Sequence, residues 1–498
     1  MAPTSARIPS LENSGTLTAM HRLERLQSGI PGLDALLSGG LVAGASYIVQ
    51  GHPGSGKTIF ANQIAFHHAK AGNQVLFATL LSESHDRLFQ FLSTLSFFDR
   101  SRIGTEIHYV SAFDALENEG LDEVVTLLRR EIVRQKASLL VVDGLVNARM
   151  DGDARIDAKR FIARLQGHAA FAGCTVIFLT SSTMEDGGPE HTMVDGVIEL
   201  GEHLIGSRTF RRIRLRKTRG SPALGGLHEI EITSDGIVVH PRLEAFLRHP
   251  SRFDLEPPVD RVASGIPGFD EMIGGGLPRA SSSLLLGPSG CGKTTMGLAF
   301  LQCCTVEDPG ILFGLYETAA RLLLKAEEVG LKLKPLVDSG ALTIVWERPT
   351  ERLLDALGHR LLDVVYRTGA KRLFIDSLSA MSRATTMPDR TVDFFTALMN
   401  ELRAHEITVL ASWEMRDLFG EEVHAPTPEL SGLVDNLVLM RYMKQGAELR
   451  RVVSVLKVRD STHDPLLREF VVTKEGASLQ RMVEPVVIAL PSQTVSRR

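Results

Sequence analysis

Short apolar runs alternate with amphipathic stretches along most of the chain, and the whole series occurs twice. The first apolar run of each series, at 47–49 and at 284–286, leads into a glycine-rich loop. Apolar residues four positions apart follow each loop, which indicates a helix. Further apolar runs predict buried strands at 75–77, 139–142, 311–313 and 373–375, and strand-rich segments follow at 210–216, 228–233 and 451–456. Strands that alternate with helices favour a mostly parallel sheet covered on both faces.

The second series repeats the first closely enough to be a duplicated domain. The sequence SGIPGLD at 28–34 returns as SGIPGFD at 264–270, and later matched positions drift by only a few residues. A repeat of this length is a whole domain and not a solenoid unit. We therefore predict a polar tail at 1–22, a first domain at 23–243, a proline-containing linker at 244–258, a second domain at 259–485 and a second tail at 486–498.

The composition is that of an ordinary soluble protein. Lys plus Arg is 55 and Asp plus Glu is 59, and the net charge of −4 argues against a chain that coats nucleic acid. The four cysteines contain no C-x-x-C pair, so we expect no zinc ribbon. No apolar run reaches the roughly 20 residues that cross a bilayer, and no secretory signal is visible at the N-terminus. We expect a cytoplasmic protein without membrane contact.

Both glycine-rich loops match G-x-x-x-x-G-K-[ST], the pattern of a nucleotide-binding P-loop. The glycines let backbone N–H groups converge on phosphate oxygens, the lysine neutralises those oxygens, and the threonine helps to hold Mg²⁺. A chance glycine turn is a poor alternative for two copies at matched positions. We predict ATP and Mg²⁺ as cofactors, bound by Gly51, Gly54, Ser55, Gly56, Lys57 and Thr58 in the first half and by Gly287, Gly290, Cys291, Gly292, Lys293 and Thr294 in the second.

One aspartate in each half ends a buried strand downstream of the P-loop. Asp143 ends the run LLVVD and Asp376 ends LFID. A carboxylate at this place suits a ligand of Mg²⁺ or of its water, so we predict that Thr58, Asp143, Thr294 and Asp376 form the metal sites. The alternative is an aspartate that caps a turn.

Hydrolysis also needs a group that orients or deprotonates water. Neither Asp143 nor Asp376 is followed by glutamate, so the end of the second strand is the natural place for a carboxylate. Glu317 stands there in the second half and Glu83 stands near it in the first. An exposed loop carboxylate without a catalytic role is the alternative at both positions.

A K-x-R sequence ends a late strand in each half. It consists of Lys217 and Arg219 in the first half and of Lys457 and Arg459 in the second. The matched copies favour a functional role, and a solvated basic strand end is the alternative. A further set of arginines thickens the first patch, namely Arg211, Arg212, Arg214 and Arg216. This patch could touch nucleic acid, but no interleaved aromatic residues support base stacking.

Taken in order, these motifs resemble the KaiC family and its relatives, which are RecA-like ATPases. The resemblance covers residues 23–480 in two tandem copies. It implies two RecA-like domains per chain, stacked in a hexameric double ring, with ATP between neighbouring subunits. By resemblance, Lys217, Arg219, Lys457 and Arg459 would reach the γ-phosphate of the neighbouring chain. The family's second domain is also a serine/threonine autokinase.

The chain departs from the clock protein of that family in ways that bear on phosphorylation. The clock protein carries a Glu-Glu pair after each second strand, whereas this chain has Tyr316-Glu317 in the second half and Leu81-Ser82-Glu83 in the first. The paired phosphoacceptors become Ser431-Gly432, and the C-terminal tail is short. We expect hydrolysis and assembly, with Ser431 as the candidate phosphoacceptor and Thr427 as its nearest alternative, but no two-site phosphorylation cycle.

The sequence therefore predicts a homo-oligomeric ATPase that works as a signalling switch with an unidentified protein partner. One rival is a DNA-dependent ATPase of the RecA/RadA or helicase kind, against which the net charge and the missing C-x-x-C pairs argue. The second rival is a nucleotide-sensing scaffold with negligible turnover, which the reduced Glu pairs would suit.

Overall fold

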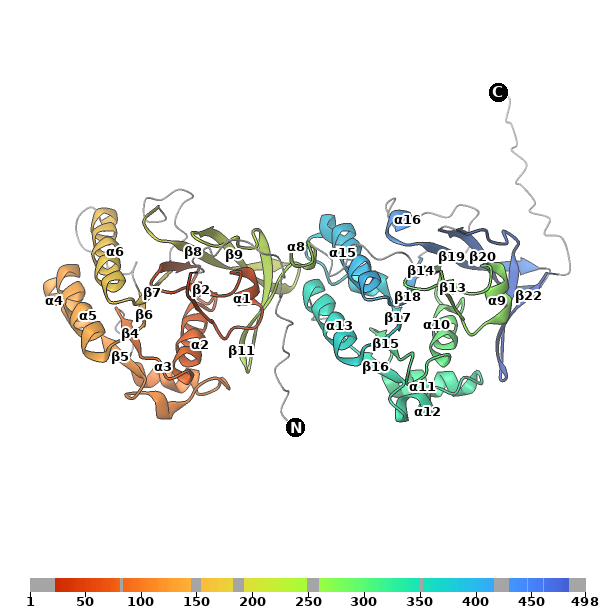
Figure 1. Ribbon diagram of the computed structural model, residues 1–498, viewed down its shortest axis with the longest axis horizontal. Coiled ribbons are helices and arrows are strands. Elements are labelled where there is room, and N and C mark those ends of the chain that lie inside the picture. The colour runs from red at the N-terminus through yellow and green to blue at the C-terminus, as the bar shows by residue number, and fades with distance from the viewer. Residues whose placement is uncertain are drawn as a thin grey trace, which may run out of the picture. The chain divides into compact units, whose positions relative to one another are not determined.

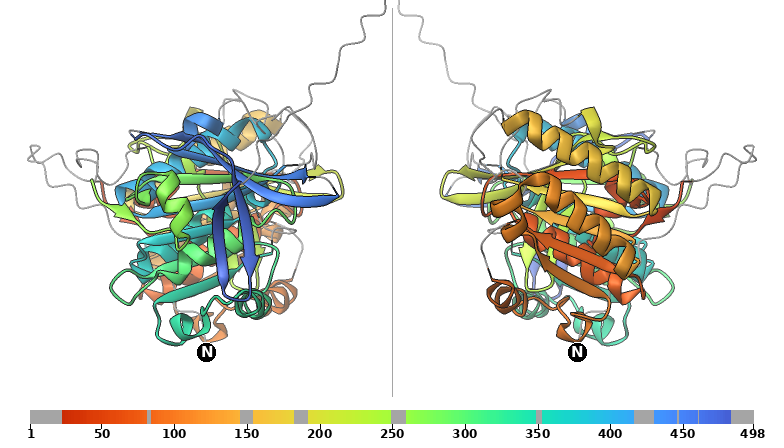
Figure 2. Two further views of the ribbon diagram at one scale, coloured as in Figure 1. Left: turned by 90° about the vertical axis from the view of Figure 1, so that its right-hand side faces the viewer. Right: turned by 90° about the vertical axis from the view of Figure 1, so that its left-hand side faces the viewer.

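The computed structural model describes residues 23–80, 84–144, 154–181, 192–248, 259–348, 353–415, 430–445, 447–459 and 461–482, without the side chains of 154–158, 430 and 431. The chain divides into two compact units, Met1–Phe246 and Leu247–Arg498. The division falls inside the segment 244–258 that the sequence predicts as a linker. Each unit is an α/β domain built on one nine-stranded sheet (Figures 1 and 2).

In the first unit the strand order is β11-β10-β9-β8-β3-β7-β6-β4-β5. The six neighbouring strands from β8 to β5 are parallel, and β9, β10 and β11 continue the sheet as antiparallel hairpins. The strands are β3 (Ser46–Gln50), β4 (Val75–Thr79), β5 (Ile107–Ser111), β6 (Leu139–Asp143), β7 (Thr175–Thr180), β8 (Gly196–Ile205), β9 (Arg208–Thr218), β10 (Leu227–Thr233) and β11 (Gly236–His240). A separate small sheet pairs β1 (Arg25–Leu26) with β2 (Leu41–Val42).

Helices cover both faces of this sheet because successive strand residues point to opposite sides. Val49 and Phe77 pack with α2 (Lys57–Lys70) in one core, while their neighbours Ile48 and Leu76 join a second core that contains residues of α5 and α6. Figure 1 shows α2 and the α5–α6 pair on opposite sides of the strands. The helices are α1 (Leu33–Leu36), α3 (His85–Leu92), α4 (Phe113–Glu119), α5 (Leu121–Gln135), α6 (Ala154–Phe171) and α8 (Leu243–Phe246).

The second unit repeats this topology with the order β16-β15-β17-β18-β14-β19-β20-β21-β22. Its strands are β14 (Ser282–Gly287), β15 (Gly310–Gly314), β16 (Leu342–Trp346), β17 (Arg372–Asp376), β18 (Thr408–Glu414), β19 (Asn436–Gln445), β20 (Glu448–Val458), β21 (Arg468–Thr473) and β22 (Gly476–Arg481), with β12 (Arg261–Val262) and β13 (Leu277–Pro278) as the small pair. Its helices are α9 (Pro267–Met272), α10 (Lys293–Gln302), α11 (Ala319–Glu328), α12 (Lys334–Asp338), α13 (Leu354–Thr368), α14 (Leu378–Ser382), α15 (Thr391–Ala404) and α16 (Leu430–Leu433). The predicted fold class, two tandem mostly parallel domains with a strand-rich C-terminal part, is confirmed.

Inside each unit the P-loop helix packs against the sheet, and at one such contact the two units differ in which partner is large. Gly297 is the fifth residue of α10, and a Cβ added to it would lie 2.2 Å from the ring of Phe374, the third residue of β17. At the same places the first unit has Ala61 on α2 and Val141 on β6. All four residues are buried. The second unit therefore fills the contact with a large strand side chain and no helix side chain, and the first unit with a smaller side chain on each.

We expect Gly297→Ala to destabilise the second unit by about 1–2 kcal/mol, because overpacking against Phe374 outweighs the gain in helix propensity of about 1 kcal/mol. Adding Phe374→Val should recover part of the loss, since the pair would then match Ala61 and Val141. Thermal unfolding of the single and double variants measures this coupling. Strictly additive effects of the two substitutions would show that the residues do not share one packing constraint.

Candidate nucleotide-binding sites

Each P-loop is held between the end of a strand and the start of a helix. In the first unit the loop joins β3 to α2, and in the second it joins β14 to α10. A Cβ on Gly51 would lie 2.2 Å from the carbonyl oxygen of Leu200, and one on Gly287 would lie 2.3 Å from that of Met440. The loops therefore run against the neighbouring strand too closely for a side chain. Left-handed φ angles occur at Gly54 (83°), Gly56 (98°), Gly290 (79°) and Gly292 (107°).

The P-loop lysines fold back over their own loops. Lys57 Nζ donates to the carbonyl oxygens of Gly51 and His52, both at 2.8 Å, and lies 3.5 Å from the Ser55 hydroxyl. Lys293 Nζ donates to Gly287 at 2.7 Å and to Pro288 at 2.6 Å. Burial lowers the pKa of Lys57, and the charge of Asp143 opposes this shift in part. Both ammonium groups thus lie inside the curve of the loop, where phosphate oxygens would bind.

At Cys291 the second loop carries a thiol in place of the serine hydroxyl of Ser55. Cys291 is buried, and its Sγ lies 3.8 Å from Lys293 Nζ. Burial raises the pKa of this thiol, against the charge of Lys293. The side chain therefore serves to fill the loop as a neutral thiol.

The threonine after each lysine contacts the predicted metal-binding aspartate. Thr58 Oγ1 donates to Asp143 Oδ2 at 3.2 Å, and Thr294 Oγ1 donates to Asp376 Oδ2 at 2.8 Å. Hydroxyl and carboxylate oxygens are the hard donors that Mg²⁺ prefers. The four residues that the sequence assigns to metal sites are thus brought together in two pairs, and their donor atoms fit that ion.

Ser412 on β18 is a residue of the second site that the sequence analysis missed. Its hydroxyl donates to Asp376 Oδ1 at 2.6 Å, so both oxygens of this carboxylate are oriented by hydroxyl groups. In the first unit Leu179 on β7 occupies the matching place, since Val49 pairs with Leu179 as Leu285 pairs with Ser412. The two aspartates therefore sit in different surroundings although their sequence motifs agree.

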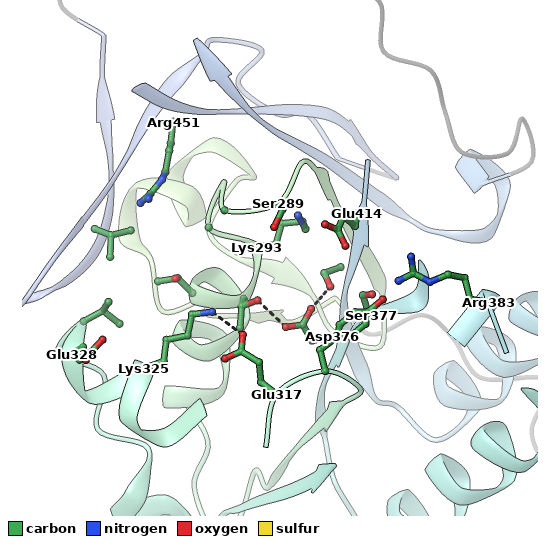
Figure 3. A pocket seen from close by; sticks show the side chains of 18 residues that line it. Ser289, Lys293, Glu317, Lys325, Glu328, Asp376, Ser377, Arg383, Glu414 and Arg451 are labelled. Carbon is green, nitrogen blue, oxygen red and sulfur yellow. Dashed lines mark hydrogen bonds and ion pairs between the residues drawn. The ribbon is translucent and has the colours of Figure 1, made fainter. Parts of the chain in front are cut away.

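A pocket of about 860 Å³ lies above the second P-loop (Figure 3). Lys293 and Thr294 line it from the start of α10, and Asp376 lines it from the end of β17. Glu317 and Lys325 line it from the region of α11. Its remaining lining residues are Ser289, Gly290, Gly292, Thr295, Tyr316, Glu328, Val329, Ser377, Arg383, Ser412, Glu414, Arg451 and Val472. The pocket therefore combines the P-loop, the candidate metal-binding pair and the candidate catalytic carboxylate of one unit.

The candidate carboxylate Glu317 follows β15 and immediately precedes Thr318, the N-cap of α11. Lys325 Nζ donates to its Oε1 at 3.1 Å. Tyr316, before it, is 50 % exposed, and the Arg383 guanidinium lies 5.6 Å from its ring centre. In the first unit Ser84 is the corresponding N-cap of α3, and Glu83, which precedes it in the sequence, lies outside the described residues.

In the second unit the K-x-R residues are anchored on their own unit by the neighbouring residues Val434 and Asp435. Lys457 Nζ donates to the carbonyl oxygen of Val434 at 3.0 Å, and Arg459 donates to Asp435 Oδ1 at 3.1 Å. Asp435 in turn accepts from the backbone N–H of Ser282, the first residue of β14, at 2.9 Å. Burial opposes ionisation of Asp435, but the hydrogen bond from Ser282 and the charge of Arg403 outweigh it and hold the pKa of this carboxyl below its usual value.

The first unit builds the same anchor less tightly. Lys217 Nζ donates to the carbonyl oxygen of Val194 at 2.6 Å, whereas Arg219 lies 3.8 Å from Asp195. Asp195 accepts from the backbone N–H of Ser46 at 3.0 Å, as Asp435 does from Ser282. Burial and the neighbouring arginine lower the pKa of Lys217, and the same two causes lower that of Lys457.

These anchors place each K-x-R at one end of the central strands, and the P-loop of the same unit lies at the other end. Ser46 and Ser282 begin the strands whose far ends lead into the P-loops. Five residue steps at about 3.3 Å each lie between Ser46 and Gly51 and between Ser282 and Gly287, so each serine is roughly 16 Å from the first glycine of its P-loop. The side chains of Arg219 and Arg459 therefore face away from the nucleotide site of their own unit.

Among the four β9 arginines that the sequence groups into a basic patch, three pair with carboxylates or are buried opposite them, while Arg214 is exposed. Arg216 pairs with Glu199 at 2.5 Å and Arg211 pairs with Glu202 at 3.4 Å, both across the β8–β9 hairpin. Arg212 is buried opposite Glu229 in the register of β9 and β10. Carboxylates thus neutralise much of the charge that nucleic acid would need.

Two further expectations concern the acceptor window and membranes. Ser431 lies in the short helix α16, with its side chain outside the described part, and Thr427 falls outside the described residues altogether. Among the helices that the structure describes, none combines the length and the apolar character needed to span a bilayer.

Comparison with known proteins adds an independent line of evidence. A family model described as "ATPase: KaiC" matches the chain twice, over residues 26–244 and 262–483. The chain is 28 % identical to the circadian clock oscillator protein KaiC of Rippkaea orientalis over 491 residues, which cover 95 % of this chain and 92 % of that protein. It is 27 % identical to the protein of the same name from Thermosynechococcus vestitus over 510 residues, 98 % of this chain and 95 % of that protein. The protein of that name from Picosynechococcus sp. is 26 % identical over 502 residues, 97 % of this chain and 95 % of its own length.

Proposed function

Because the chain belongs to the KaiC family of ATPases, we propose that it binds and hydrolyses Mg-ATP in both halves and acts as a nucleotide-dependent signalling switch in the cytoplasm. The observation that carries this proposal is the duplicated arrangement of P-loop lysine, threonine and aspartate. Thr58 with Asp143 and Thr294 with Asp376 form the same hydrogen-bonded pair beside a lysine that lies inside its loop. The presence of such a pair in each half supports two working sites.

In this proposal the chain's own residues bind and orient the triphosphate. The loop N–H groups surround the phosphates, and Lys57 or Lys293 exchanges its loop carbonyls for phosphate oxygens. The threonine–aspartate pairs would hold Mg²⁺, and a metal bound there would supply charge neutralisation for the transferred phosphoryl group. Glu317 orients or deprotonates the attacking water of the second site, and Glu83 is the matching candidate in the first. The K-x-R residues complete each site from a neighbouring chain.

Assembly should depend on ATP, because a site completed by another chain closes only when the γ-phosphate bridges the two. Repeated head-to-tail contacts of this kind close into rings. We expect a hexamer with a non-hydrolysable ATP analogue and smaller species without nucleotide. Light scattering measures both states. A monomer under both conditions would rule out the ring and with it the role of the K-x-R residues.

Autophosphorylation should be slow or absent. The window 429–435 keeps one hydroxyl, at Ser431, and has glycine at the second acceptor position, while Tyr316 replaces one of two carboxylates at the base position. Phosphoryl transfer needs an in-line hydroxyl and a group that accepts its proton. Phosphosite mapping after incubation with Mg-ATP should find at most substoichiometric phosphate, mainly on Ser431, with Thr427 as the nearest alternative. Stoichiometric phosphate cycling on two residues would contradict this expectation.

A signalling role implies a protein partner that distinguishes the ATP and ADP states, and a pull-down in each nucleotide would identify it. Within the part of the chain that the structure describes, the rival DNA-dependent ATPase is disfavoured, since Glu199 and Glu202 pair with Arg216 and Arg211 of the basic strand. Strong stimulation of ATP hydrolysis by DNA would reverse this judgement.

A further inference from the structure

Two cations of helix α11 lie beside Glu317, which stands two residues before the helix. Glu317, Arg321 and Lys325 are four residues apart in the sequence, a spacing that brings side chains to one side of a helical turn. Lys325 Nζ lies 3.1 Å from Glu317 Oε1, and Arg321 Nε lies 3.6 Å from Glu317 Oε2. Both oxygens of the candidate catalytic carboxylate therefore face a cation, as Figure 3 shows for Lys325.

Of the two cations, Lys325 is the one that belongs to the site. It lines the nucleotide pocket and its side chain is 38 % exposed, whereas Arg321 is 77 % exposed and does not line the pocket. Glu328, one turn further along α11, also lines the pocket, yet the described hydrogen bond of Lys325 goes to Glu317. The lysine thus holds the carboxylate from within the pocket.

The first unit has no lysine at this place. Counted from the N-caps Ser84 and Thr318, Lys325 is the seventh residue of α11 and Phe91 is the seventh residue of α3. Phe91 is 56 % exposed, so the exchange is not a matter of core packing. The cation is therefore particular to the second site, where it contacts the candidate catalytic carboxylate Glu317.

We propose that Lys325 is a positioning residue for ATP hydrolysis in the second site. It holds Glu317 through a charge-assisted hydrogen bond, so that the carboxylate faces the pocket and not the solvent. A flexible glutamate at a loop end otherwise samples many rotamers, and few of them can orient a water on the γ-phosphate. This inference rests on the proposed function, because it assigns Lys325 to the turnover of that site.

The test compares full-length chains, with the second-site rate taken as the difference between the parent and Lys293→Ala. We expect Lys325→Met to lower the second-site kcat about tenfold, with KM and the ATP dissociation constant unchanged within about twofold, because the lysine acts on orientation. Lys325→Arg should restore the rate to within about twofold of the parent, since it keeps the charge. Lys332→Met, at an exposed lysine beyond α11, is the matched control.

A double-mutant cycle links the effect to Glu317. In a Glu317→Gln background, Lys325→Met should cause no further loss, because the partner of the lysine has already gone. An unchanged kcat in Lys325→Met, a full second loss in the double variant, or weaker ATP binding instead of slower turnover would each overturn the positioning role. If the parent and Lys293→Ala hydrolyse ATP equally fast, the proposed function of the second site is itself wrong, and the role of Lys325 falls with it.

Discussion

Mixing two inactive chains is expected to restore ATP hydrolysis. One chain carries Glu83→Gln and Glu317→Gln, which leave both P-loop lysines in place to bind ATP, and the other carries Arg219→Ala and Arg459→Ala. Because each K-x-R lies at the opposite end of the strands from its own P-loop, a ring that contains both chains has some interfaces in which an intact carboxylate meets an intact arginine. Random mixing in equal amounts makes about one quarter of the interfaces complete, so about one quarter of the parental rate should return.

The arginine variant alone should hydrolyse ATP at least about a hundredfold more slowly than the parent while it still binds ATP, as loss of an arginine finger slows other P-loop enzymes. Steady-state phosphate release measures the rate, and equilibrium binding measures the nucleotide. Light scattering shows whether rings form in the mixture. If rings form and yet remain inactive, the arginines act within their own chain and the trans arrangement is wrong.

Removal of one P-loop lysine should empty one site and leave the other filled. Lys57→Ala is expected to reduce bound ATP from two per chain to one by loss at the first site, and Lys293→Ala by loss at the second. In the proposed sites each lysine pairs with phosphate oxygens, and losing such a charge-assisted contact should weaken binding at that site about a hundredfold. Native mass spectrometry counts the nucleotides directly.

Lys70→Ala, at the exposed end of α2, is the matched control for charge and should keep both nucleotides. Two nucleotides bound to either P-loop variant at ATP concentrations near the parental dissociation constant would mean that the sites have been assigned to the wrong loops.

Most of the fold could be predicted from the sequence because the decisive features are local. A run such as 284–286 before a glycine loop and an amphipathic segment specifies strand, turn and helix within about 20 residues. The strand ends were harder to place: β9 runs over Arg208–Thr218 and β20 over Glu448–Val458, longer than the segments 210–216 and 451–456. Pairing with neighbouring strands extends a strand beyond its apolar core, and single-segment patterns do not contain that information.

The parts of the candidate sites that the sequence analysis missed are contacts between distant segments. Ser412 meets Asp376 only because β18 and β17 are neighbours, and no motif marks a serine inside an apolar strand. Lys325 had a local signal, since it follows Glu317 at helical spacing, but a charged helix face is usually solvated. The assignments of Glu83 and Ser431 remain predictions, because the side chains of both lie outside the described part of the chain.

The packing of Gly297 against Phe374, where the first unit packs Ala61 against Val141, also limits how the two halves of the gene can recombine. A crossover between helix and strand would bring Ala61 beside Phe374, where the added methyl group meets the ring, or would bring Gly297 beside Val141 and leave a void. Either hybrid domain would lose part of its stability. Divergence at such a contact therefore disfavours collapse of the tandem duplication into a single domain by a crossover between this helix and this strand.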